Sequence, residues 1–156
     1  MTQGAPLEQL RHVLEELLEC STRLQETLLA ERDALTQHNL NTLNAHTEAK
    51  KDLLVRLEAL ELQRRAQLNQ LGFDPSQEAI VPELESLWQQ VLDALRVCQE
   101  ANEVNGAIVR THQTQTQRAL DLLAGRDSDQ TLYEASGYQA ARVQAARADS
   151  GEISKA

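Results

Sequence analysis

The sequence predicts an all-α fold, an antiparallel bundle of three long helices followed by a flexible, partly helical C-terminal tail. Aromatic residues make up only 3% of the 156 residues, whereas Leu, Ala, Glu, Gln and Arg are abundant. This composition suits long helices and is poor for sheets. Leucines also recur at alternating steps of three and four residues, which places them on one helix face. Turn-forming segments interrupt these stripes, so several helices within one domain are expected.

The first apolar stripe begins close to the N-terminus. Its leucines are Leu7, Leu10, Leu14, Leu17, Leu24 and Leu28. Pro6 suits the first turn of a helix, where its missing N–H is not needed. The stripe continues to Leu35, and the polar segment 36–39 then has low helix propensity. We expect a tight connection there, with Asn39 as the N-cap of the next helix.

The second stripe follows directly. Its leucines are Leu40, Leu43, Leu53, Leu54, Leu57, Leu60, Leu68 and Leu71. Gly72 is suited to a helix C-cap, and Pro75 blocks continuation. At ~1.5 Å per residue, each of the first two helices is roughly 45 Å long. A short connection between them predicts an antiparallel hairpin.

The third stripe begins at Pro82, after a loop with a short turn at residues 76–80. It keeps one heptad register through Leu84, Trp88, Val91, Leu95, Cys98, Asn102, Asn105, Val109, His112, Thr116, Ala119 and Leu123. Its middle is polar, so that stretch is expected to bury less and to face a partner, water or a polar network. Gly125 is expected to cap the helix, which predicts a bundle over residues 1–125 and a tail over residues 126–156.

Within this third stripe, Asn105 and Gly106 form a dipeptide that usually indicates a turn. The apolar register continues across it, which favours an unbroken helix. Gly106 would then allow another backbone to come close, while Asn102 and Asn105 hydrogen-bond across the seam. We therefore predict a structural role for these three residues.

The tail carries two of the four aromatic residues of the chain, Tyr133 and Tyr138. Residues 138–148 have high helix propensity without an adequate apolar stripe, so they are expected to fold on a partner. Residues 131–137 allow two interpretations, a contact surface for a partner or a turn that packs Tyr133 against the bundle.

Charge and targeting signals restrict the partners. The net charge of −9 disfavours nucleic acid and anionic membranes, which need clustered Lys and Arg. No run of about 18 apolar residues and no signal peptide is recognisable, so a cytoplasmic protein without membrane insertion is expected.

Catalytic and metal-binding motifs are missing from the sequence. There is no phosphate-binding glycine loop, no H-E-x-x-H and no G-x-S-x-G. None of the four histidines follows a Glu at the spacing of a carboxylate-bridged metal pair. Cys20 and Cys98 are expected to be small buried residues rather than a disulfide or nucleophile. We therefore predict neither an enzyme nor a bound cofactor or metal.

Several elements together resemble a known family. They are Glu31-x-x-Ala34-Leu35, Lys50-x-x-Leu53-Leu54-x-x-Leu57, Leu60-Glu61-x-x-Arg64-Arg65, Trp88, Asn102-x-x-Asn105-Gly106 and Thr131-Leu132-Tyr133-x-x-x-Gly137. In these elements the chain resembles the FlgN family of flagellar export chaperones, the type III secretion chaperones for the hook–filament junction proteins. The asparagine element followed by the tail element is the most specific part of the resemblance.

The resemblance implies a chaperone that binds C-terminal helical segments of the hook-associated junction proteins, prevents premature assembly and delivers its clients to the export gate. It implies that Tyr133 docks at the cytoplasmic domain of the gate, and it adds the export ATPase as a further candidate partner. The other tail residues expected to bind partners are Leu132, Gly137, Tyr138, Arg142 and Val143. Trp88 is expected to be structural.

Two alternative functions remain open on the sequence. A helical chaperone of this kind could serve another late flagellar substrate, the filament cap protein or flagellin. The half-polar third stripe could instead be the self-association face of a homo-oligomeric coiled coil with a structural or adaptor role.

Overall fold

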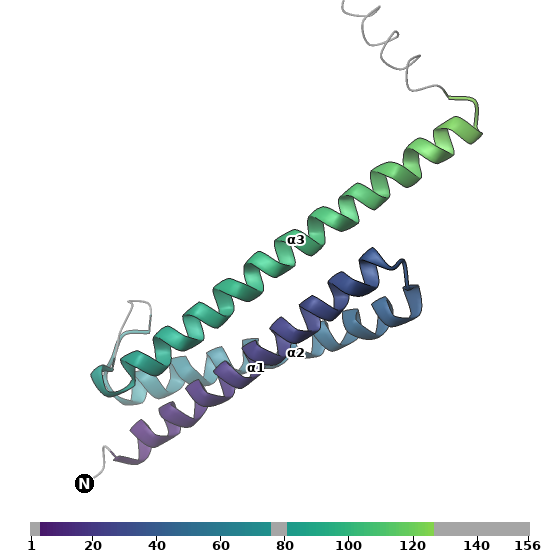
Figure 1. Cartoon of the computed structure of the whole chain (residues 1–156). Helices are drawn as coiled ribbons and strands as arrows, with labels where there is room; N and C mark the ends of the chain where they lie inside the picture. Colours follow the sequence, from purple (N-terminus) through teal and green to yellow (C-terminus); the bar gives the residue numbers. More distant parts are fainter. Residues whose placement is uncertain (1–3, 76–80, 127–156) are drawn as a thin grey trace, which may run out of the picture. The chain divides into compact units, whose positions relative to one another are not determined.

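The computed structural model describes residues 4–75 and 81–126, and nearly all of this part is helical. It contains three α-helices, α1 (Gly4–Thr36), α2 (Leu40–Gln70) and α3 (Glu85–Leu123), and a 3-10 turn, η1 (Pro82–Leu84), directly before α3 (Figure 1). No strand occurs among the described residues, and the predicted all-α bundle is confirmed.

The chain divides into two compact units, Met1–Val109 and Arg110–Ala156, and each is described by itself. The first unit contains α1, α2, η1 and the larger part of α3. The described part of the second unit is the remainder of α3 with its cap. The predicted boundary between residues 1–125 and 126–156 is a different division, based on composition, and stays a prediction.

The helices begin and end close to the residues that the sequence indicates. Asn39 caps α2 by accepting a hydrogen bond from the backbone N–H of Thr42, as predicted. Gly72 and Gly125 follow α2 and α3 with φ of 81° and 72°, and His38 has the same left-handed conformation after α1, with φ of 54°. In all three places the next N–H reaches back to a carbonyl five residues earlier, which is the Schellman pattern.

Helix α3 runs without interruption through Asn105 and Gly106, so the predicted unbroken helix is confirmed. Pro82 opens η1 rather than α3 itself, and its fixed φ suits this first turn. The turn predicted at residues 76–80 lies outside the described residues.

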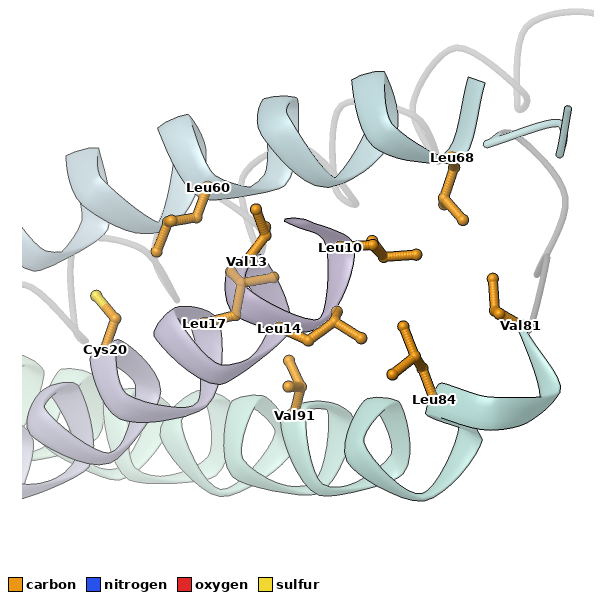
Figure 2. Packing of buried hydrophobic residues seen from close by; sticks show 10 residues of the cluster. All are labelled: Leu10, Val13, Leu14, Leu17, Cys20, Leu60, Leu68, Val81, Leu84 and Val91. Carbon is orange, nitrogen blue, oxygen red and sulfur yellow. The ribbon is translucent and has the colours of Figure 1, made fainter. Parts of the chain in front are cut away.

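The apolar core lies where α1, α2, η1 and the first turns of α3 meet (Figure 2). The α1 stripe supplies most of it, and α2 contributes only two fully buried leucines. The ten residues drawn are Leu10, Val13, Leu14, Leu17, Cys20, Leu60, Leu68, Val81, Leu84 and Val91. A smaller second cluster of Leu24, Leu28, Cys98 and Ala101 continues the α1–α3 contact.

Within the first unit, α1 and α2 form the predicted antiparallel hairpin, while α3 lies parallel to α1 (Figure 1). The thiol of Cys98 donates to the carbonyl of Ser21, and the amide of Asn105 donates to the carbonyl of Leu28. Both pairs are separated by 77 residues, which is a whole number of heptads. A single register therefore relates α3 to α1.

Beyond Val109, the side chains of α3 are exposed, apart from the half-buried His112 and Asp121. Leu120, Leu122 and Leu123 are the large apolar residues in this stretch, and Leu123 is 86% exposed. Among the described residues, no helix is long and apolar enough to cross a membrane.

Candidate functional site

A buried polar cluster joins the three helices of the first unit. We define the polar cluster as Glu31 and Arg32 of α1, Lys50 of α2 and Asn105 of α3. Nζ of Lys50 lies 2.8 Å from one carboxylate oxygen of Glu31, and Nδ2 of Asn105 donates to the other at 3.0 Å. Nε of Arg32 donates to Oδ1 of Asn105 at 3.0 Å. Each helix therefore contributes a polar group to one connected network.

Helical periodicity explains why these polar groups face inward. Glu31 lies three residues after Leu28 and four before Leu35, so it occupies the seam of α1. It is only 4% exposed, and Asn105 is 2% exposed. A carboxylate at this depth is costly unless it is paired and hydrogen-bonded. Here Lys50 supplies the countercharge and Asn105 a further donor.

The polar cluster selects one arrangement of the helices more than it adds stability. A buried ion pair contributes little net free energy compared with an apolar contact, but losing one partner is costly. Any shift of α3 along α1 would separate Asn105 from both the Leu28 carbonyl and Glu31. The cluster therefore fixes the register of α3 on the hairpin.

A second contact connects α2 directly to α3. The guanidinium of Arg64 lies 4.5 Å from the centre of the Trp88 ring, a cation–π contact. The same guanidinium donates two hydrogen bonds to the carboxylate of Glu61, and Arg65 donates a third. The hydrogen bonds from Arg64 are the largest cause that lowers the pKa of Glu61. Trp88 is thus half-buried and held from one side by a charged side chain.

An open apolar groove lies between these two contacts. We name it the α2–α3 groove; it has a volume of about 230 Å³ and includes Leu24, Leu28, Leu54, Leu57, Leu95 and Asn102 in its lining. Leu54 is 48% exposed although most of the groove lining is apolar. The α2–α3 groove is therefore a place where the described chain leaves leucine surface in contact with solvent.

The structure separates the two asparagines that were expected to act together. Asn105 is buried in the polar cluster, whereas Asn102 is exposed, lines the α2–α3 groove and makes no side-chain hydrogen bond with any described residue. Gly106 is half-buried and follows Asn102 by four residues, so it lies one turn further along the same face. Of the two asparagines, only Asn105 contacts α1.

The two thiols have the environment of packing residues. Both cysteines are free and buried, as predicted. Burial raises the pKa of the Cys20 thiol and of the Cys98 thiol, which is opposite to the shift of a reactive thiolate. No group of three or more His, Cys, Asp or Glu side chains suited to a metal ion occurs in the described ranges. The prediction that the protein is not an enzyme stays a prediction.

The residues predicted to bind partners all belong to the tail. They are Leu132, Tyr133, Gly137, Tyr138, Arg142 and Val143, and they lie outside the described residues. The sequence interpretation missed Arg32 and the α2–α3 groove. The signal for the polar cluster was present, because Glu31 is a charged residue in a mostly apolar seam, but its partner Lys50 is known only once the hairpin is formed.

Comparison with known proteins identifies the family. The family model described as FlgN protein matches residues 1–141. The flagella synthesis protein FlgN of Proteus mirabilis is 29% identical over 143 residues, which cover 90% of this chain and 97% of that protein. The protein of the same name from Salmonella typhimurium is 27% identical over 133 residues, 84% of this chain and 90% of that protein.

No solved structure matches the chain. The family match nevertheless includes all three helices and extends past the last described residue, Arg126, through residues 131–137. The resemblance seen in the sequence is thereby confirmed. The chain belongs to the FlgN family.

Proposed function

We propose that this protein is a cytoplasmic export chaperone of the flagellar type III system. It binds hook–filament junction proteins, prevents their premature assembly and delivers them to the export gate. The observation that carries the proposal is the family match over residues 1–141, which includes the Thr-Leu-Tyr element of the tail. The curated relatives are flagella synthesis proteins, which supports a role in the same process.

The proposal divides the chain between a rigid base and a tail that binds partners. The first unit supplies the base, because the polar cluster and the apolar core fix its three helices in one register. The tail begins after the Gly125 cap and contains the candidate residues for the gate and the client. Tyr133 is assigned to the gate, and the helix-prone residues 138–148 are assigned to the client.

Truncation after Arg126 tests the assignment of client binding to the tail. This end point keeps the hydrogen bond from the Arg126 N–H to the Asp121 carbonyl and so preserves the cap of α3. The truncated chain should lose binding to a purified junction protein in calorimetry. Its thermal unfolding transition, followed by circular dichroism at 222 nm, should stay where it is in the full chain. Undiminished client binding would refute the assignment.

The two tail tyrosines provide a matched pair for the gate. Tyr133→Ala should weaken binding to the cytoplasmic domain of the export gate while client binding is retained. Tyr138→Ala makes the same chemical change five residues later and should leave gate binding intact. Equal effects of both substitutions on gate binding would contradict the specific role of Tyr133.

Client identity is tested by offering several late flagellar substrates at equal concentration. The proposal expects junction proteins to be captured in preference to the filament cap protein and flagellin. Preferential capture of either of the other two would replace the proposed client.

A further inference from the structure

The α2–α3 groove is an open part of the first unit. Helices α1 and α2 lie close together along their length, whereas α3 is held to them mainly through side chains. The groove lies between α2 and α3, with Leu24 and Leu28 of α1 also lining it. An apolar cavity of about 150 Å³ is enough for a benzene-sized group. A groove of about 230 Å³ therefore has room for one large apolar side chain.

Charge beside the groove indicates the chemistry of the occupant. Glu58 follows Leu54 by one turn on α2, and Glu103 follows Gln99 by one turn on α3. Both carboxylates are exposed and neither makes an ion pair with a described residue. Lys50, the cation in the lining, is already paired with Glu31. Lys51 and Arg96, one turn earlier on the same faces, are paired with Glu48 and Asp93. The unpaired charges beside the groove are therefore acidic on both sides, which matches an apolar residue flanked by Lys or Arg.

The groove face of α3 carries Asn102 and, one turn later, the half-buried Gly106. Asn102 is exposed and its side chain has no hydrogen-bond partner among the described residues. Gly106 costs about 1 kcal/mol relative to Ala in a helix interior. Gly106 has no side chain and so allows another helix to approach closely. The unpaired amide of Asn102, one turn earlier, can form a hydrogen bond with that helix.

We infer that the α2–α3 groove binds one α-helix of the junction-protein client, with a large apolar side chain between Leu54 and Leu95 and basic side chains beside Glu58 and Glu103. This inference rests on the proposed function and adds a second contact to the tail. The client helix takes the place of a fourth helix, so that the bundle and the tail hold the client together.

Two adjacent residues of α2 test the inference in the full chain. Leu54→Lys removes an apolar wall and adds a positive charge inside the groove. Val55→Lys makes the same charge change at a residue that is 67% exposed and does not line the groove. Calorimetry with a purified junction protein should show affinity lowered about tenfold by Leu54→Lys and unchanged by Val55→Lys. Asn102→Arg narrows the groove from α3 at an exposed site and should also weaken binding.

The outcomes separate this inference from the proposed function. If the unmodified chain binds no junction protein, both are wrong. If it binds and Leu54→Lys and Asn102→Arg bind equally well, the groove assignment alone is overturned.

A photo-crosslinking benzophenone side chain in place of Gln99, which lines the groove, identifies the occupant directly. A crosslink to the client supports the inference. A crosslink to residues 127–156 of the same chain or to a second copy, with client present, overturns it.

Discussion

The strongest structural prediction concerns Asn105, whose amide group makes three hydrogen bonds to residues of α1. It donates to the Leu28 carbonyl at 2.8 Å and to Glu31 at 3.0 Å, and it accepts from Arg32 at 3.0 Å. A neutral buried hydrogen bond contributes about 1 kcal/mol and one to a charged group about 1.5–3 kcal/mol. Arg32 keeps a second acceptor in the Ala101 carbonyl, so its loss is small. Asn105→Ala should therefore destabilise the fold by about 3 kcal/mol.

Asn102→Ala is the matched control, because it makes the same change on the same helix at an exposed position. Both substitutions gain about 0.5 kcal/mol from the higher helix propensity of Ala, but Asn102→Ala loses no described hydrogen bond. With an m-value of about 2 kcal/mol/M, urea unfolding followed by circular dichroism should show a midpoint about 1.5 M lower for Asn105→Ala than for Asn102→Ala. Midpoints within about 0.3 M of each other would refute the role given to the polar cluster.

Three further predictions concern the ion pairs and the thiols. Lys50→Met should destabilise the fold by about 2 kcal/mol, because Glu31 stays buried without a countercharge. The additional change Glu31→Gln should restore most of this loss of stability. No recovery in the double variant would argue against the Lys50–Glu31 ion pair. Arg64→Met should change the fluorescence of Trp88, the only tryptophan of the chain, whereas Arg65→Met should not; identical spectra would exclude the cation–π contact. Burial raises the pKa of both thiols above their usual value of 9.0, so the folded state holds their protons more tightly than the unfolded state. The thiols should therefore not affect the free energy of unfolding below about pH 9, and this free energy should fall as the pH rises above that value. Alkylation of the thiols in the native protein at pH 8 should be slow until urea is added. Rapid alkylation of the native protein would contradict the burial of the thiols.

The sequence predicts the local features of this fold well. The ends of the helices follow from residues within one turn of each other, as at Asn39 and Gly72, and such signals do not depend on the rest of the chain. The left-handed conformation of His38 was not predicted, because only a small share of residues other than glycine adopt it. The hydrogen bonds of the turn, from Asn39 to the Ala34 carbonyl and from His38 to Leu35, stabilise it there.

The packing of α2 shows where periodicity is insufficient. Its leucines continue the helical spacing, yet only Leu60 and Leu68 are fully buried, and Leu40 and Leu54 are exposed. A regular stripe indicates which face is apolar but not whether a neighbour covers it. The partners of α2 are α1 along one side and α3 at Trp88, and the side near Leu54 remains open.

The candidate site was predictable only in part, for a related reason. Asn102 and Asn105 are three residues apart, which rotates them by about 60° around the helix. This angle separates a residue that faces α1 from one that faces the groove, and sequence spacing alone treated them as a pair. The tail residues such as Tyr133 were assigned through the family resemblance, because no periodic pattern constrains them.

Amide hydrogen exchange of the full chain, with and without a purified junction protein, tests the central claim most directly. Binding through the tail and the groove predicts slower exchange in residues 127–148 and in the turns of α2 and α3 around Leu54 and Asn102, with little change in α1, which lies in the core. Unchanged exchange throughout residues 127–148 in the presence of saturating client would contradict the assignment of this protein as a chaperone that holds its client through the tail.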